Sequence, residues 1–339
     1  MDLKALLKRG ALLAAANWQT VVIQFVAETT FQVLLAAPIV GAAILVAVLL
    51  GADLADLLQG SLRDMFTTIA SALMSEPVAL VAFITAFAIV LLGGSVFMFL
   101  VKGGTVDVLL AAEAAAGPIE REPLTLDMLR GASRFTLARF TAGCSRLFRP
   151  YLSLGILLMI VYGLSATVYL TFVVIGYRAA EGRVLVIGWT FIAALAFGLA
   201  MAWITLVNLL YLLVQIAIAA EGVGLTDGCR AVARFVRAQF RQLAAVFLVV
   251  VVLTIAATLA SALAWSGVGL IAFVPLIGLA VFPLHLAALL LRGLVFQYLG
   301  LTAVGAYVTL YHGFTAREPS VSVSFPASSL QPPASAKVS

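Results

Sequence analysis

Residues 243–265 read LAAVFLVVVVLTIAATLASALAW, an apolar run without a charged side chain. A helix needs roughly 20 mostly apolar residues to cross the hydrocarbon core of a bilayer, so this run is long enough to span one. Similar runs occur along the rest of the chain, at residues 31–50, 78–101, 152–176, 184–219 and 283–312. The sequence therefore predicts an all-α protein, a polytopic transmembrane helix bundle of about six spans.

The last of these runs is the least regular, because Arg292 interrupts it. An apolar segment, residues 268–282, precedes it, with Pro275 inside this segment and Pro283 directly after it. Proline interrupts helices, and the segment is too short to span a bilayer alone. We interpret residues 268–282 as an outer-leaflet or re-entrant connection.

Composition supports the same conclusion for the whole chain. Of its 339 residues, 64% are apolar and 10% are charged, whereas a soluble domain is about 45–50% apolar and about 25% charged. The mean hydropathy is +1.17, and so few charged side chains cannot coat a globule of this size. A soluble enzyme, a disordered protein and a disulfide-stapled secreted domain are therefore excluded.

The distribution of Lys and Arg sets the expected orientation. Sixteen of the 20 basic residues fall before the first span, in the segments 102–151 and 220–242, or in the tail. Only Arg63, Arg178 and Arg183 fall on the other side. Because cytoplasmic segments carry the excess of Lys and Arg, we expect a multi-pass protein of the cell inner (plasma) membrane with both termini in the cytoplasm.

The chain divides into three parts. Residues 1–30 are expected to form an amphipathic lead-in at the membrane interface, whose apolar run stops at Asn17. Residues 31–312 form the six-helix transmembrane domain. Residues 313–339 are a Ser- and Pro-rich cytoplasmic tail that we expect to be disordered. On the outer side, apolar residues recur at helical spacing in 52–77, which predicts an amphipathic helix there.

Two cytoplasmic segments match each other at an offset of 100 residues. TLDMLRGASRFTLARF at 125–140 aligns without gaps with LTDGCRAVARFVRAQF at 225–240, and six of 16 positions are identical. Each segment lies between an inward-running span and an outward-running one. We interpret the match as an internal parallel repeat with units at about 78–176 and 184–265, and we expect cytoplasmic amphipathic interfacial helices in both copies.

The second copy carries four arginines at helical spacing, which would share one face of a straight helix: Arg230, Arg234, Arg237 and Arg241. Guanidinium groups bind phosphate through paired hydrogen bonds. We therefore predict that these four residues bind anionic lipid headgroups or phosphate, with Arg130 and Arg134 of the first copy as a weaker repeat of the site. The alternative is that the same charges only set the topology and adhere to lipid in general.

Polar side chains inside the spans are few. Asn208, Tyr211 and Gln215 share one face of the fourth span and, with Arg292 of the sixth, are candidates to line a polar cavity. The alternative is that they are hydrogen-bonding contacts between helices. The sequence contains no familiar motif of a hydrolase, protease or nucleotide-binding loop, and two histidines cannot build a His-rich metal site. We predict no catalytic residues, no metal, no cofactor and no nucleic-acid partner.

The stretch AIAAEGVGLTDGCRAVARFVRAQFRQL at 217–243 joins an inward-running helix, through a Glu-Gly element, to an amphipathic helix rich in arginine and aromatic residues. Together with AYVTLYHGFTARE at 306–318, it resembles a group of prokaryotic six-helix integral membrane proteins that includes the membrane domain of glycerophosphoryl diester phosphodiesterases. The resemblance covers about residues 185–318 and includes no phosphodiesterase domain. It implies a six-helix bundle in a prokaryotic inner membrane, without catalytic residues.

The function expected from these features is that of a non-enzymatic integral membrane protein. Such a protein would bind anionic lipid and organise or assist an unidentified protein partner at the cytoplasmic face. The alternative is a transporter, or a subunit of a lipid-handling permease, with a polar cavity between its helices. A wet, continuous cavity would favour transport, and a dry, packed bundle would favour the non-transporting protein.

Overall fold

The computed structural model describes residues 2–50, 77–121, 125–180, 183–272 and 275–317, and the regular structure in these ranges is helical. In chain order the helices are α1 (Leu3–Ala16), α2 (Trp18–Leu50), α5 (Pro77–Ala115), α6 (Leu126–Ala132), α7 (Leu137–Ala179), α8 (Arg183–Glu221), α9 (Leu225–Ala272) and α10 (Pro275–Thr315). Within the described residues, six helical segments are long and apolar enough to cross a membrane. The prediction of an all-α, multi-pass membrane protein is confirmed.

The helices extend beyond the apolar runs that predicted them. Only Asn17 separates α1 from α2, so the first spanning helix starts well before residue 31. At the other end of the chain, residues 268–272 belong to the end of α9 and residues 275–282 to the beginning of α10. Pro283 lies inside α10. The predicted outer helix in 52–77 falls almost wholly outside the described residues, as does the tail from residue 318 onward.

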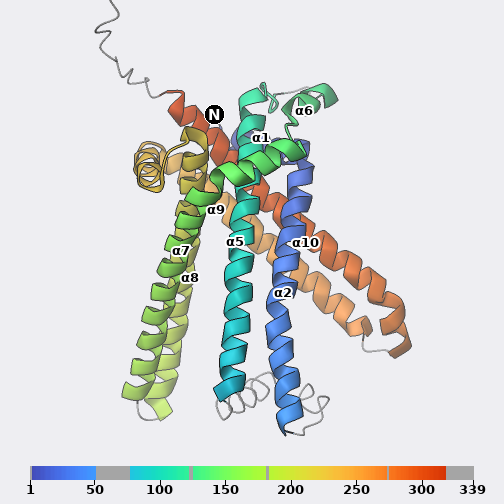
Figure 1. The fold of residues 1–339 in the computed structure, drawn as a ribbon, viewed down its shortest axis with the longest axis vertical. Helices are drawn as coiled ribbons and strands as arrows, with labels where there is room; N and C mark the ends of the chain where they lie inside the picture. The colour runs from blue at the N-terminus through green and yellow to red at the C-terminus, as the bar shows by residue number, and fades with distance from the viewer. Residues whose placement is uncertain (1, 51–76, 122–124, 181–182, 273–274, 318–339) are drawn as a thin grey trace, which may run out of the picture.

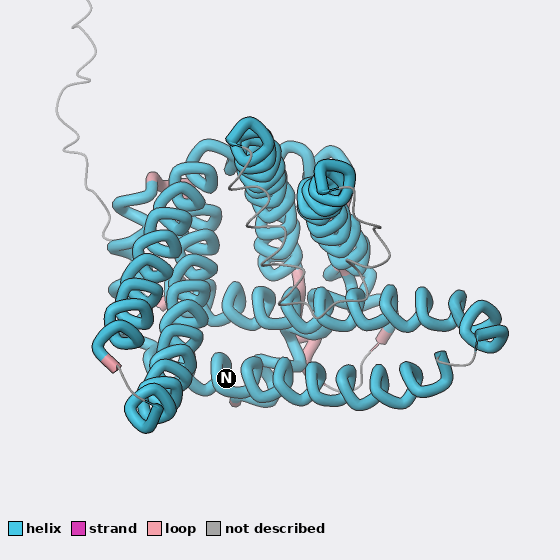
Figure 2. The backbone as a smooth tube through the Cα atoms, turned by 90° about the horizontal axis from the view of Figure 1, so that it is seen from below, coloured by secondary structure: helices cyan, strands magenta, loops and turns pink. Residues whose placement is uncertain are grey.

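The spanning helices form three pairs that share one end and diverge at the other (Figure 1). The pairs are α2 with α5, α7 with α8, and α9 with α10. Seen along the long axis, the α9–α10 pair extends sideways from the other two (Figure 2). We call the end that holds α1, α6 and the last turns of α10 the packed end, and the opposite end the splayed end.

The main hydrophobic core lies at the packed end. Its largest cluster comes mostly from the first turns of α7 and α9 and the last turns of α8 and α10. Tyr151, Phe235 and Tyr311 are fully buried in it. Large apolar side chains in the spans are instead exposed, as Leu199 is at 74%. Lipid tails are as apolar as leucine, so the hydrophobic effect does not drive such side chains together in a bilayer. The diverging helix pairs therefore present a surface suited to lipid.

Polar side chains hold α7 against α8 inside their spans. Tyr162 donates a hydrogen bond to Oδ1 of Asn208, and Nε1 of Trp203 donates to Oγ of Ser165 at 3.1 Å. Hydrogen bonds of this kind join helices in lipid, where apolar attraction between them is weak. Asn208 thus makes a hydrogen-bonding contact between helices, which was the alternative to its lining a polar cavity.

α1 lies against α10 at backbone distance. A Cβ atom on Gly10 would lie 2.5 Å from the carbonyl oxygen of Thr302 and 2.7 Å from the amide nitrogen of Ala306. A Cβ atom on Gly305 would lie 3.0 Å from Cα of Gly10. Only glycine permits this approach, and α1 buries Leu13 completely as a result. α1 is therefore an integral part of the packed end.

Asn17 fixes the corner between α1 and α2. Its buried side chain donates from Nδ2 to the carbonyls of Leu13 at 3.0 Å and Ala132 at 3.2 Å. Its Oδ1 accepts hydrogen bonds from the backbone N–H groups of Arg134 at 2.8 Å and Phe135 at 3.1 Å. One side chain thus joins the end of α1 to the connection between α6 and α7.

Candidate functional site

The first of the two matching segments is not a single helix. The break between α6 and α7 falls inside it, so Arg130 lies in α6 and Arg134 in the connection. The backbone N–H of Arg134 is bonded to Asn17 there. Thr136 ends the break, because its Oγ1 accepts the N–H of Arg139 at 3.2 Å and caps the first turn of α7. Arg130 and Arg134 therefore do not share a helix face.

The second segment is helical from Leu225 but is bent near its end. Gln239 has φ −120° and ψ 23°, outside the helical range, and α9 kinks there. Residues on the two sides of the kink no longer follow one helical period, so Arg241 leaves the face defined by the three arginines before it. The prediction of one continuous arginine stripe is therefore wrong. The two matching segments also break at different positions, so their likeness in sequence does not extend to this local structure.

The arginines differ in their partners. Nη1 of Arg230 lies 3.1 Å from Oδ1 of Asp227, an exposed pair on one helix turn that the first copy repeats. Arg237 and Arg241 have no carboxylate within ion-pair distance among the described residues. A paired arginine must give up its partner to bind a second anion. The two arginines beside the kink therefore offer the more accessible charge.

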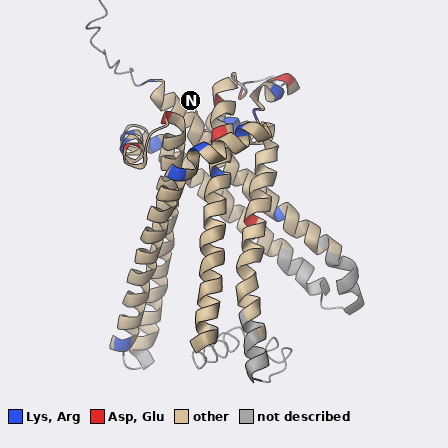
Figure 3. Ribbon diagram, in the orientation of Figure 1, with Lys and Arg blue, Asp and Glu red and all other residues tan. Residues whose placement is uncertain are grey.

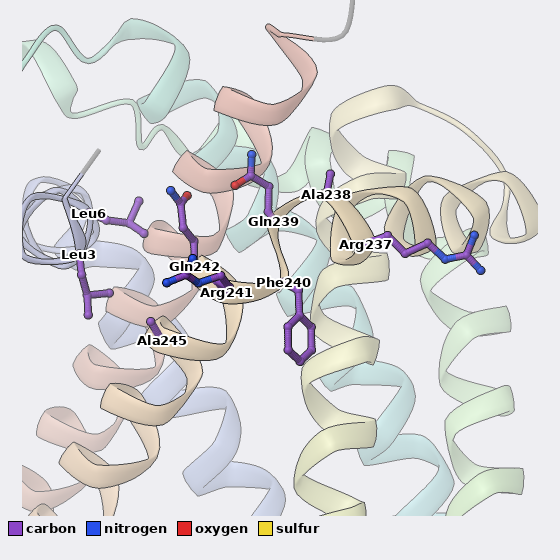
Figure 4. A pocket seen from close by; sticks show the side chains of 9 residues that line it. All are labelled: Leu3, Leu6, Arg237, Ala238, Gln239, Phe240, Arg241, Gln242 and Ala245. Carbon is purple, nitrogen blue, oxygen red and sulfur yellow. The ribbon is translucent and has the colours of Figure 1, made fainter.

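A groove of about 600 Å³ opens at the kink, between α1 and α9. Its lining comes from both helices: Leu3, Leu6, Arg237, Ala238, Gln239, Phe240, Arg241, Gln242 and Ala245. Figure 4 shows that Arg241 reaches toward α1, that Phe240 points toward the spans, and that Arg237 points away from Arg241. The carboxamides of Gln239 and Gln242 point away from the spans. Along the groove, an aromatic ring is thus followed by a guanidinium group and then by two amides.

A smaller cavity, of about 80 Å³, adjoins this groove, because Leu6, Gln239 and Gln242 line both. Its other wall comes from the last turns of α10 and from Arg317, which is exposed. Gln239 and Gln242 therefore share this cavity with Arg317.

The α1 wall of the groove is held by a buried ion cluster that was not among the predicted site residues. Nε of Arg9 donates to both carboxylate oxygens of Glu113, at 3.0 and 2.9 Å, and Nη1 donates to Oε2 of Glu120 at 2.8 Å. The guanidinium group also bonds two backbone carbonyls just after α5. Thr309 of α10 donates to Glu113 at 3.1 Å. One arginine thus ties α1 to α5, and through Glu113 to α10.

The charges in this cluster support one another. Burial disfavours the charged form of Arg9, but the hydrogen bonds and negative charges of Glu113 and Glu120 outweigh it and raise the arginine pKa. Burial also opposes ionisation of Glu120. Hydrogen bonds from its own backbone N–H and from Arg9 nevertheless hold the Glu120 pKa below its usual value. Arg9 and Glu120 are therefore both charged at neutral pH.

Two ionisable residues inside the spanning helices were also not predicted as site residues. Glu28 of α2 accepts hydrogen bonds from Nε2 of Gln297 in α10 and, at 3.4 Å, from Nε2 of Gln32. Nζ of Lys102 in α5 lies 5.4 Å from the ring centroid of Tyr211. The apolar runs placed both charges just outside their spans, whereas both lie within the helical segments that can cross a membrane.

The four predicted cavity residues occupy different places. Asn208 bonds across the α7–α8 pair. Tyr211 and Gln215 are 6% and 1% exposed, and the Tyr211 hydroxyl and the Gln215 Nε2 have no hydrogen-bond partner within the described structure. Arg292 lines a groove of about 360 Å³ walled by α9 and α10 alone, with its guanidinium carbon 5.7 Å from the ring centroid of Phe296. Arg292 therefore lies apart from the residues of α8.

Among the residues that the structure describes, no three His, Cys, Asp or Glu side chains are grouped so that they could hold a metal ion. No family model, curated protein or solved structure matches this chain. The resemblance of residues 217–243 and 306–318 to the membrane domain of glycerophosphoryl diester phosphodiesterases therefore stays a prediction.

Proposed function

We propose that this chain is a non-enzymatic integral membrane protein that binds an anionic phospholipid headgroup in the groove between α1 and α9. It would use this site to organise or assist a protein partner at the cytoplasmic face. The observation that carries the proposal is the open groove at the kink. It is lined by Arg237 and Arg241, which have no carboxylate partner in the described part of the chain.

The position of the groove suits a headgroup. Charged side chains gather at the packed end, and long stretches of the paired helices carry none (Figure 3). Phe240 is 63% exposed and points from the groove toward the spans. An exposed aromatic ring at the border between charged and apolar surface is typical of the membrane interface. A phosphate at the level of Arg241 would then have its acyl chains beside Phe240.

The chemistry of the groove suits a phosphodiester. Arginine offers a planar pair of N–H donors to phosphate oxygens, and each basic residue near an anionic leaflet contributes about 1 kcal/mol. Two arginines therefore contribute roughly 2 kcal/mol, which is modest. The concave shape and the apolar wall of Leu3 and Leu6 would add the contacts that distinguish a bound lipid from general adhesion.

The orientation follows from the same charges. The arginines and lysines of the packed end would face the cytoplasm under the positive-inside rule. Both termini would then be cytoplasmic, and the groove would face the inner leaflet of the inner membrane, which carries the anionic lipid.

Native mass spectrometry with two charge-matched variants tests the proposal. Arg237→Gln/Arg241→Gln and Arg130→Gln/Arg230→Gln each remove two positive charges from the packed end, but only the first changes the groove. We expect the wild-type protein and the second variant to retain an anionic phospholipid after gentle purification. The first variant should retain about thirtyfold less. Equal retention by the two variants, or no retained lipid on the wild-type protein, would contradict the site.

Transport is the second candidate function, and one observation favours it. The hydroxyl of Tyr211 and the amide nitrogen of Gln215 are buried without a partner in the described structure, and Lys102 lies against the Tyr211 ring. Unpaired buried donors are costly unless a polar group reaches them. Water in this region would give the bundle a polar path.

Cysteine accessibility distinguishes the two functions. Tyr211→Cys, in a background with Cys144→Ala and Cys229→Ala, should react with a small water-soluble thiosulfonate if a wet path exists. Failure to react would exclude that path, provided that the exposed Cys229 of the unmodified chain reacts under the same conditions.

A further inference from the structure

The two carboxamides beside Arg241 are not needed to bind a phosphate. Gln239 is the residue at which α9 kinks, and Gln242 directly follows Arg241. Both line the groove and the smaller cavity next to it. Neither side-chain amide has a hydrogen-bond partner within the described ranges. The groove therefore presents two unused amides on the side of Arg241 away from the spans (Figure 4).

The chemistry of these amides selects among headgroups. A carboxamide has two N–H donors and one carbonyl acceptor, so it can satisfy a hydroxyl group, which both donates and accepts. An ammonium group would call for a carboxylate, and the linings of the groove and the smaller cavity contain none. The side chains beside Arg241 at this level are the neutral Gln239 and Gln242, and Arg317 lines only the opposite wall of the smaller cavity. The lining fits an uncharged group that carries hydroxyls.

The order of side chains along the groove sets the orientation of the bound ligand. Phe240 points toward the spans, Arg241 reaches across the groove toward α1, and the amides of Gln239 and Gln242 point to the other side. A phospholipid has the same order of apolar chain, phosphate and headgroup. With its phosphate at Arg241, its headgroup would meet the two amides and the cavity of about 80 Å³ behind them.

We infer that the groove selects an anionic phospholipid whose headgroup is a neutral polyol, such as glycerol or inositol. Arg241 would bind the phosphate, and Gln239 and Gln242 would bind the hydroxyls. The inference rests on the proposed lipid site and adds the class of headgroup to it. Phosphatidic acid has the phosphate without the polyol, so it is the reference ligand.

The test is competition between two lipids on the purified full-length protein. Native mass spectra are recorded with equimolar phosphatidylglycerol and phosphatidic acid, and the ratio of the two bound lipids is the readout. In Gln239→Leu/Gln242→Leu we expect this ratio to fall about fivefold relative to the wild-type protein, the effect of roughly one neutral hydrogen bond. Anionic lipid should still be retained. An unchanged ratio would overturn the inference.

Further variants separate this inference from the proposed site. Gln242→Leu alone changes an exposed side chain and leaves the kink residue in place, so it should lower the ratio in part without affecting the fold. Arg241→Gln should reduce binding of both lipids. If Arg241→Gln has no effect, the lipid site itself fails. If Arg241→Gln reduces binding but the glutamine-to-leucine variants keep the wild-type ratio of the two bound lipids, only the inference about the headgroup fails.

A soluble competitor distinguishes a lipid from a free phosphoester. Inositol 1-phosphate carries a phosphate and a polyol without acyl chains. We expect millimolar inositol 1-phosphate to leave the bound phosphatidylglycerol in place, because the chains add contacts beside Phe240. Displacement at concentrations equal to that of the lipid would overturn the assignment to a lipid.

Discussion

Arg9 and Glu113 form a buried ion pair between α1 and α5, with Nε 2.9 Å from Oε2 and only 10% and 4% of the two side chains exposed. Because Glu113 also accepts a hydrogen bond from Thr309, the pair joins three helices at the packed end. The same α1 contributes Leu3 and Leu6 to the groove at the kink of α9. The ion pair therefore fixes one wall of the proposed lipid site.

Loss of Arg9 should destabilise the fold strongly. Arg9→Met leaves Glu113 buried without its counter-charge, which typically costs about 3–5 kcal/mol. The free energy of unfolding in detergent, measured by denaturant titration, checks this. Arg230→Gln is the control, because it breaks a pair that is 81% and 60% exposed and should cost less than about 1 kcal/mol. Similar losses for the two variants would show that the buried pair does not hold α1.

Glu120 should make stability depend on pH. Its pKa in the folded protein lies below the usual value, because its backbone N–H and Arg9 outweigh the opposing effect of burial. A depressed pKa means that ionised Glu120 stabilises the fold above its unfolded pKa, and that this contribution is lost as the pH falls through the folded pKa. Wild-type protein should therefore melt above Glu120→Gln at pH 7. The gap should begin to narrow below the unfolded pKa of about 4.3, and a constant gap from pH 7 to pH 3 would rule out this role.

Gly10 should not tolerate a side chain. Gly10→Val places Cβ against the backbone of α10 at Thr302 and Ala306, which cannot move as a flexible side chain could. Overpacking of this kind costs about 1–3 kcal/mol, and thermal unfolding in detergent measures it. The control is Gly313→Ala in α10, because a Cβ atom added there would meet nothing within 4 Å. That control should be neutral or slightly stabilising, so destabilisation by both changes would point to helix effects rather than to the α1–α10 contact.

The six spans could be predicted because they depend on local properties. Length and hydropathy identify a run such as 243–265 without knowledge of its neighbours. The core could not be predicted in the same way, since it lies at the packed end, where Phe235 precedes one apolar run and Tyr311 stands at the end of another. Burial there follows from how the helix ends meet, which is a property of the whole fold.

In the candidate site, too, local features could be predicted from the sequence and contacts between distant segments could not. Basic residues in 225–241 pointed to the part of α9 that lines the groove, but no proline or glycine marks Gln239 as a kink, so the sequence predicted a straight helix. Arg9 did leave a signal. It shares one face of α1 with Leu6 and Leu13 at helical spacing, and a charged residue on an apolar face predicts a buried partner. The identity of that partner, 104 residues away, required the structure.

Cys229 offers a direct test of orientation. It is exposed near the start of α9 at the packed end, whereas Cys144 is buried. Because Lys and Arg gather at this end, we expect a membrane-impermeant maleimide to label Cys229 in inside-out vesicles and not in intact cells. Ala180→Cys, after α7 at the splayed end and in a Cys144→Ala/Cys229→Ala background, should show the opposite pattern. Labelling of Cys229 from outside would place the groove in the leaflet that lacks the anionic surface potential. The attraction between its arginines and lipid phosphate would then lose its electrostatic basis.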